Sequence, residues 1–170
     1  MAHEKAKIYE QAKEAIPTMG IKEGIEYFTK NNQFNSEKEF TASLLSVLNE
    51  LIGKIYGYEI IEIEKEKTFD LSRLDLPNQR IDIFCKTKEG VDLFIECKNP
   101  KTSLQELNLS LGQMLNYQMI IENINNPCKL IFATSRFSFY MARVIKRFSL
   151  NYDVILHNTE TTMFLLNKEL

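Results

Sequence analysis

The segment that most constrains how this chain can fold runs from Arg80 to Lys98. It contains two runs rich in β-forming residues on either side of a short Lys-Glu-Gly turn, a pattern that predicts a β-hairpin. Because side chains alternate between the two faces of a strand, Asp82 of the first run shares a face with Glu96 and Lys98 of the second. The opposite face is expected to be apolar and to carry Ile81, Ile83, Leu93 and Ile95.

The charged face of this hairpin places two carboxylates and one ammonium group among apolar residues. Burying charged groups costs free energy unless they are paired or bind a cation. Two interpretations of Glu96 and Lys98 are open: an exposed ion pair worth less than ~1 kcal/mol, or part of a cation site. The Glu-x-Lys pattern alone is weak evidence, and the strand-borne Asp82 on the compatible face makes the second interpretation more specific.

Composition limits the classes of protein to which the chain can belong. Its 170 residues, 44% hydrophobic and 26% charged, predict one domain, with a helical extension (1–34) and a core (36–170). The formal net charge of −2 predicts no general attraction to polyanions, so any nucleic-acid contact requires a local basic patch or metal ions. The three cysteines lack CxxC spacing, which argues against disulfides, zinc and iron–sulfur clusters. Without a membrane span or signal-peptide pattern, we expect a cytoplasmic location and no membrane partner.

Residues 36–52 form the clearest predicted helix. Its apolar residues recur at helical spacing: Phe40, Leu44, Leu48 and Leu51. Extending this stripe backward reaches Glu37, which is either directed at the sheet or is a first-turn acid stabilised by the helix dipole. Ser36 and Glu39 have the spacing of a capping box, so we expect Glu39 to cap the helix. Which of the two acids belongs to a site stays open.

The remaining elements predict an α/β fold. Helices are expected at 3–15, 21–30, 103–123 and 137–148, strands at 58–64, 128–133, 152–156 and 161–166, and a loop at 65–79. Because helices and strands alternate after residue 36, the sequence predicts a central mixed β-sheet flanked by helices.

Two of these helices carry further candidate residues. Gln113 and Tyr117 are four positions apart and project from one side of the helix over 103–123. Ordinary packing is the competing explanation for that pair. Arg136 and Arg143 belong to a basic segment, which is either a solvated face or a surface that contacts phosphates.

The hairpin residues suit a particular chemistry. Asp82 and Glu96 on neighbouring strand ends provide hard oxygen ligands, to which the backbone carbonyl of Cys97 can add, and such a set suits Mg²⁺ or Mn²⁺. Lys98 on the same face can orient or deprotonate a water molecule, or stabilise charge on a phosphate. Metal-assisted hydrolysis of a phosphodiester needs these parts. The side chain of Cys97 alternates to the opposite face and is expected in the core.

These residues resemble a known signature. Asp82 followed by Glu96-Cys97-Lys98, in the context RIDI…IECKNP, resembles the motif of the PD-(D/E)xK nuclease superfamily. The segment SEKEFTASLLSVL looks like the first core helix of that fold, with Glu37 at the position of its acid. The segment QMLNY is similar to the QxxxY motif of RecB-type nucleases. The greatest likeness is to the N-terminal nuclease domain of type I restriction motor subunits, over roughly residues 36–135.

The resemblance implies a restriction-endonuclease-like fold and cleavage of DNA to 5′-phosphate and 3′-hydroxyl ends. It further implies that Glu37, Asp82 and Glu96 bind Mg²⁺, that Lys98 assists the attacking water, and that Gln113 and Tyr117 help to position nucleic acid. The chain departs from the pattern in having Ile81 where many members have proline. It also lacks a helicase motor and iron–sulfur cysteines.

Two functions follow as expectations. The first is a metal-dependent deoxyribonuclease of restriction, defence, recombination or repair, acting alone, as a homodimer or with a motor or other subunit. The second is a catalytically silent module of the same fold that binds DNA or regulates a larger complex.

Overall fold

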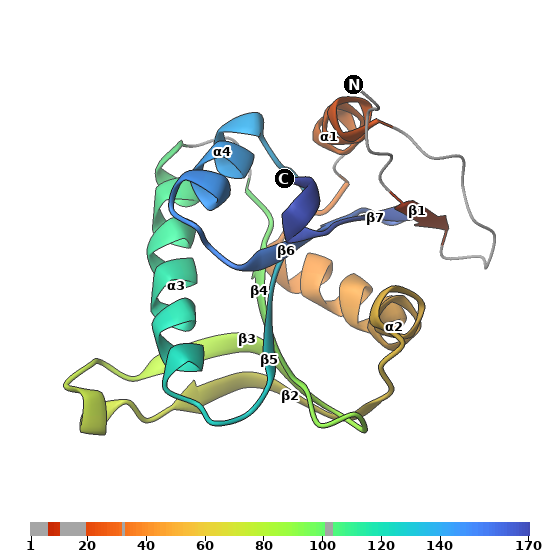
Figure 1. Ribbon diagram of the computed structural model, residues 1–170. Helices are drawn as coiled ribbons and strands as arrows, with labels where there is room; N and C mark the ends of the chain where they lie inside the picture. The colour runs from red at the N-terminus through yellow and green to blue at the C-terminus, as the bar shows by residue number, and fades with distance from the viewer. Residues whose placement is uncertain (1–6, 11–19, 32, 101–103) are drawn as a thin grey trace.

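The computed structural model describes residues 7–10, 20–31, 33–100 and 104–170 (Figure 1). They form an α/β fold around a seven-stranded mixed sheet with the strand order β1-β7-β6-β5-β4-β3-β2. The strands are β1 (Lys7–Glu10), β2 (Ile60–Phe69), β3 (Gln79–Thr87), β4 (Asp92–Lys98), β5 (Cys128–Thr134), β6 (Tyr152–His157) and β7 (Thr161–Leu165). The helices are α1 (Ile21–Lys30), α2 (Glu37–Tyr56), α3 (Leu104–Glu122) and α4 (Phe139–Arg147), with short 3₁₀ turns at Ser72–Leu74 and Asn167–Glu169.

Helices cover both faces of the sheet (Figure 1). On one face, α2 buries the apolar stripe predicted from the sequence against β3, β4 and β5. On the other face, α1, α3 and α4 contribute Phe28, Met114 and Met141 to a second apolar cluster. The central strands therefore have apolar side chains packed on both sides, as is usual for parallel strands in α/β proteins.

Strands β4, β5 and β6 are parallel and form the centre of the sheet. Their carboxyl ends meet at one edge, where Lys98 of β4 lies beside Thr134 of β5. In open α/β sheets, sites are commonly built at this edge. The charged end of the hairpin is therefore located where the fold favours a site.

Strands β3 and β4 part at Asp82. Their antiparallel ladder runs from the pair Lys86–Asp92 to the pair Ile83–Ile95 and ends there. In this register the pair after Asp82–Glu96 would join Cys97 to Ile81, but the Cys97 N–H donates to Asp82 Oδ2 at 2.8 Å instead. The carboxylate of Asp82 thus takes the place of a backbone acceptor.

The sequence-based assignment of the first residues is wrong. Residues 7–10 were assigned to a helix over 3–15, but they form strand β1, which pairs antiparallel with β7. Pairing with an open sheet edge outweighs local helix propensity here. The rest of that predicted helix lies outside the described residues.

Two expectations around the hairpin also need correction. Residues 65–69 continue β2 instead of starting a loop, because they pair with β3 as far as Gln79. Ile81 packs in the cluster on the α3 side, apart from Ile83, Leu93 and Ile95. Glu66 of β2, between the pairs that β2 forms with Ile81 and Ile83, has a φ of 52°, and such a residue interrupts the regular alternation of side chains.

The other predicted elements occur close to their expected bounds. Part of the expected N-terminal extension belongs to the core, because Ile25 and Phe28 of α1 are buried against the sheet. Across the described ranges, no helix is long and apolar enough to cross a membrane.

Candidate active site

Lys98 lies among three carboxylates that come from three different elements. Its Nζ is 2.6 Å from Glu96 Oε1 on the same strand, 3.8 Å from Glu37 Oε1 on α2 and 4.0 Å from Asp82 Oδ2 on β3. Burial alone would lower the pKa of Lys98, but the neighbouring carboxylates outweigh burial and raise it. Lys98 is therefore a cation at neutral pH, and the three acids and the amine selected from the sequence come together.

Glu37 is the helix-borne acid of this group. The Ser36 hydroxyl accepts a hydrogen bond from the Glu39 N–H at 3.1 Å and caps α2. The Glu39 carboxylate accepts from the Asn35 N–H at 2.9 Å, one residue earlier than in a capping box. Glu39 is thus used at the helix start, whereas Glu37 points at Lys98. Partial burial raises the pKa of Glu37.

Asp82 and Cys97 are joined through the backbone. Because the Cys97 N–H donates to Asp82 Oδ2, the Asp82 carboxylate is fixed directly beside the backbone of β4. The Cys97 side chain is fully buried in the α2-side cluster, as the alternation predicted. Burial raises the pKa of its thiol well above the usual value, so the thiol is protonated at neutral pH. The carbonyl of Cys97 as a metal ligand stays a prediction.

Glu96 is the most deeply placed charged residue of the site. Its side chain is fully buried, and burial together with the charge of Asp82 raises its pKa to about 7. Tyr117 Oη lies 2.6 Å from Glu96 Oε2 and 2.7 Å from the carbonyl oxygen of Arg80. One hydroxyl proton cannot fully satisfy two acceptors. The Tyr117 hydroxyl is thus shared between the Glu96 carboxyl group and the Arg80 carbonyl, and it holds the carboxyl group in place.

Gln113 and Tyr117 do not lie in the same environment. Tyr117 is fully buried in the α3-side core, so its side chain has no surface available for nucleic acid in this conformation. Its hydroxyl instead holds Glu96, which makes it a positioning residue. Gln113 is partly exposed and lines a hollow together with Lys98 and Glu37. This side of α3 therefore contacts the core through Tyr117 and the candidate site through Gln113.

Arg136 and Arg143 lie beyond the end of β5. Arg136 is partly buried in the loop that leads to α4, and Arg143 is exposed on α4. The loop is tied to the site because the Ser135 N–H donates to the Lys98 carbonyl at 3.2 Å. Neither arginine belongs to the group around Lys98, so their contact with nucleic acid stays a prediction.

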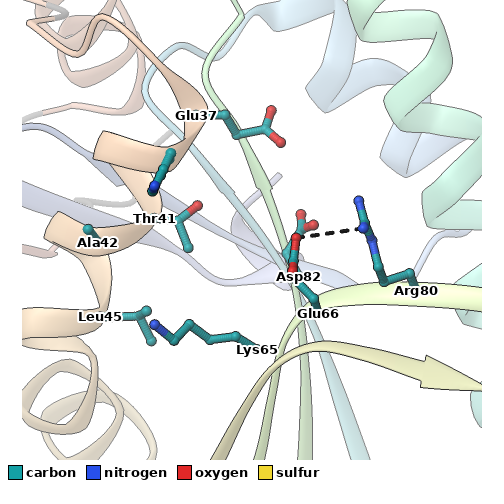
Figure 2. Close-up of a pocket in the computed structure, with 9 residues that line it drawn as sticks. Glu37, Thr41, Ala42, Leu45, Lys65, Glu66, Arg80 and Asp82 are labelled. Atoms are coloured by element: carbon teal, nitrogen blue, oxygen red, sulfur yellow. Dashed lines mark ion pairs between the residues drawn. The ribbon is translucent and has the colours of Figure 1, made fainter.

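Two hollows adjoin at Glu37. The first, of about 600 Å³, lies between α2 and strands β2 and β3, and Figure 2 shows Glu37 and Asp82 at its wall. The second, of about 450 Å³, lies between β4 and α3 and is lined by Lys98 and Gln113. Glu37 is the residue that borders both hollows.

The donor set at these hollows suits a hard divalent cation in part. Carboxylate oxygens are the ligands that Mg²⁺ prefers, and it commonly uses one or two of them together with water. However, Glu96 Oε1 is engaged by Lys98 and Asp82 Oδ2 by the Cys97 N–H. Within the described residues, no three His, Cys, Asp or Glu side chains are grouped closely enough to hold a metal ion. A metal ion bound by Glu96 Oε1 would require Lys98 to move away from that oxygen.

Sequence reasoning missed three cations that line the first hollow. Lys38 follows Glu37 on α2, Lys65 lies on β2, and Arg80 lies on β3, where it forms a 3.6 Å ion pair with Glu66 (Figure 2). Because residues 65–79 are expected to form a loop, the sequence does not place Lys65 on a strand beside Asp82. Arg80 and Asp82 are two positions apart on one strand, and this spacing could have indicated that Arg80 lies near the site.

Comparison with protein-family models, curated proteins and solved structures finds no match. The assignment of a function consequently depends on the geometry of this chain.

Proposed function

We propose that the protein is a Mg²⁺-dependent deoxyribonuclease with its active site at Lys98. The observation that carries the proposal is the approach of Glu37, Asp82 and Glu96, from three separate elements, to within 4.0 Å of the Lys98 ammonium. Bringing three acids around one amine at a strand end is costly for a purely structural purpose. The same residues were selected from sequence for their resemblance to the PD-(D/E)xK signature, and that family assignment is part of the proposal.

Each residue has a role that follows from its surroundings. Asp82 and Glu96, with Glu37 and the Cys97 carbonyl, would hold the cation. When bound, Mg²⁺ supplies neutralisation of phosphate charge and activation of water. Lys98 would turn from Glu96 toward the attacking water or the phosphate and stabilise the charge that develops there. Tyr117 would keep Glu96 in place.

Substitution of the central residues tests the proposal. Asp82→Asn keeps an oxygen that can accept from the Cys97 N–H, and Lys98→Met keeps an unbranched side chain without charge. We expect each variant to lose about 100-fold or more of Mg²⁺-dependent DNA cleavage while keeping its fold, as is usual when a charge-stabilising group is removed. Lys88→Met is the control, because Lys88 is exposed and pairs with Glu59 at the far end of the hairpin. Wild-type cleavage by both site variants would overturn the assignment.

A silent module of the same architecture is the second candidate. It is favoured by the 2.6 Å ion pair between Lys98 and Glu96, because this pair compensates the charge of the carboxylate without a metal. Such a module would bind DNA without cutting circular or linear substrates in Mg²⁺ or Mn²⁺. A crystal soaked in Mn²⁺ distinguishes the two, because the nuclease is expected to show metal at about 2.0–2.3 Å from oxygens of Asp82 and Glu96.

A further inference from the structure

Positive charge is concentrated in one part of the chain. Residues 123–152 contain no Asp or Glu, although the whole chain has 23 acids and a net charge of −2. The same segment carries five cations: Lys129, Arg136, Arg143, Lys146 and Arg147. Lys129 lies at the start of β5, where its ammonium is over the Tyr56 ring, whereas the other four cations lie on α4 or in the loop before it. These four provide local positive charge of the kind that a chain of this net charge needs in order to attract a polyanion.

Helix α4 displays part of this charge together with exposed aromatic rings. Its core face is already used, because Met141 and Ile145 are buried. Outside that face, Phe139 and Tyr140 in the first turn are 44% and 50% exposed, and Phe148 just after the helix is 64% exposed. These are the large exposed aromatic side chains within the described residues. None of the three is a member of either buried apolar cluster.

Two exposed cations of α4 have the helical spacing that places them on the same side as these rings. Arg143 is three residues after Tyr140 and four after Phe139, so it neighbours both on the helix surface. Arg147 continues the same side one turn later. Among the described residues, no ion pair joins Arg143, Lys146 or Arg147 to an acid. The surface therefore presents rings and uncompensated positive charge side by side.

This surface is close to the candidate active site. The Ser135 N–H donates to the Lys98 carbonyl, and the Ser135 hydroxyl donates to Asn99 Oδ1 at 2.5 Å. Phe139 follows Ser135 by four residues, a length of chain that spans at most about 14 Å. Figure 1 shows α4 at the end of the sheet where β4 leads out toward α3. A strand bound on α4 can reach Lys98 within a few nucleotides.

We propose that the exposed surface of α4, formed by Phe139, Tyr140, Arg143 and Arg147, binds single-stranded DNA by stacking bases on the two rings and pairing phosphates with the two arginines. Aromatic side chains stack on bases that are free of a duplex, and a cationic groove follows the backbone. Duplex DNA offers only its phosphates to such a surface, because its bases are already stacked. The inference rests on the proposed function for its biological purpose, which is delivery of one strand to Lys98, but its binding step needs neither metal nor cleavage.

Equilibrium binding in EDTA tests the proposal. Fluorescence anisotropy measures the affinity of the full chain for a labelled single-stranded oligodeoxynucleotide and for the duplex of the same sequence. Phe139→Leu and Tyr140→Leu keep apolar volume and remove the ring, and we expect each to weaken single-strand binding about tenfold. We expect duplex binding to change less than twofold. Ile61→Ala, which alters an exposed apolar side chain on β2, is the control and should bind like wild type.

The charge is tested separately, so that the result does not depend on the ring variants remaining folded. Arg143→Gln is expected to weaken binding of both DNA forms, whereas Lys88→Gln on the distant hairpin turn is not. Ring variants that bind single strands like wild type, or that lose duplex binding equally, overturn the proposal. It is also overturned by tighter binding of RNA of the same sequence, or by dimerisation that Tyr140→Leu abolishes while wild type binds no oligonucleotide. Since cleavage is not measured, a failed nuclease assay leaves this result interpretable.

Discussion

Burial and hydrogen bonding have opposite effects on the pKa of the Glu96 carboxyl group. Burial raises its pKa to about 7, while contacts with Lys98 and Tyr117 favour its charged form. The raised value means that burial and the nearby Asp82 dominate. Near neutral pH the group can therefore exchange a proton readily, which is the usual condition for a residue that must change its charge state in a reaction cycle.

The unfolding free energy of the metal-free protein should change with pH as Glu96 gains or loses its proton. A carboxyl whose folded pKa is raised from 4.5 to about 7 contributes stability that is complete below pH 4.5 and is lost as the pH rises through about 7. We expect wild type to lose up to about 3 kcal/mol of unfolding free energy over this range relative to Glu96→Gln. Urea unfolding in EDTA between pH 5 and 8 measures the difference.

The comparison with Glu96→Gln is necessary because His157 acts in the opposite sense. Burial lowers the pKa of His157 to about 4, so its contribution is complete above pH 6.5 and is lost as the pH falls through about 4. This contribution cancels when the two proteins are subtracted. Parallel stability curves for wild type and Glu96→Gln would contradict the assignment of the proton to Glu96.

Tyr117→Phe separates a positioning role from a contact with nucleic acid. The ring stays in the core while Glu96 and the Arg80 carbonyl lose their hydroxyl partner, which should cost about 1–2 kcal/mol of stability. We expect kcat to fall at unchanged KM for DNA, because the hydroxyl is buried. Tyr152→Phe, which loses a bond to the Met114 carbonyl, is the matched control and should affect stability only. A raised KM with unchanged kcat would restore the contact predicted from the sequence.

At the scale of the elements, two glycines report how closely helices approach the sheet. A Cβ on Gly24 of α1 would lie 2.2 Å from Met163 Sδ, whereas a Cβ on Gly112 of α3 meets no atom within 4 Å. We expect Gly24→Ala to destabilise by about 1–3 kcal/mol through overpacking and Gly112→Ala to stabilise by about 0.5–1 kcal/mol. Thermal unfolding measures both. If the two changes have the same sign, α1 does not pack against Met163 as described.

Helix α2 and strands β3 to β7 could be predicted from local apolar patterns, although these patterns placed Ile81 on the wrong side of the sheet. The stripe from Phe40 to Leu51 and the alternation in the hairpin specify which faces are buried, and this brought Glu37, Asp82, Glu96 and Lys98 together. Strand β1 could not be predicted in this way, since its partner β7 lies about 150 residues further along the chain. The same limit applies to β2 beyond residue 64, whose charged residues resemble a loop until β3 pairs with them.

The sequence predicts which residues form the site better than it predicts the contacts that their side chains make. The spacing of Gln113 and Tyr117 indicates a shared side of α3, but not that the sheet covers one residue and leaves the other at a hollow. Likewise, alternation cannot show that Asp82 accepts from the Cys97 N–H, because that bond forms where the ladder ends. Such contacts depend on where strands separate, which periodicity does not encode.

At the scale of the whole molecule, the cations of α4 and of the loop before it stand in a segment without acids, 123–152, whereas Lys98 has three carboxylates within 4.0 Å. Binding to nucleic acid should consequently use few phosphate contacts. If Arg136, Arg143, Lys146 and Arg147 make them all, the logarithm of the single-strand affinity should fall with the logarithm of salt concentration with a slope of about −3. Anisotropy titrations at 50–200 mM KCl in EDTA measure this slope. A slope of about −4 or steeper would indicate a larger footprint, because Lys38 and Lys65 would bring the number of phosphate contacts to six.

The bond between Asp82 and the Cys97 N–H has a consequence for how this architecture can change over evolutionary time. An oxygen acceptor at position 82 closes the end of the sheet whether or not any reaction occurs, so selection for folding alone would retain Asp or Asn there. The ammonium of Lys98 takes the place of no backbone group, and it could be lost together with the charge of Glu96. Where selection acts on folding alone, the lysine side chain would therefore be lost before the acceptor at position 82.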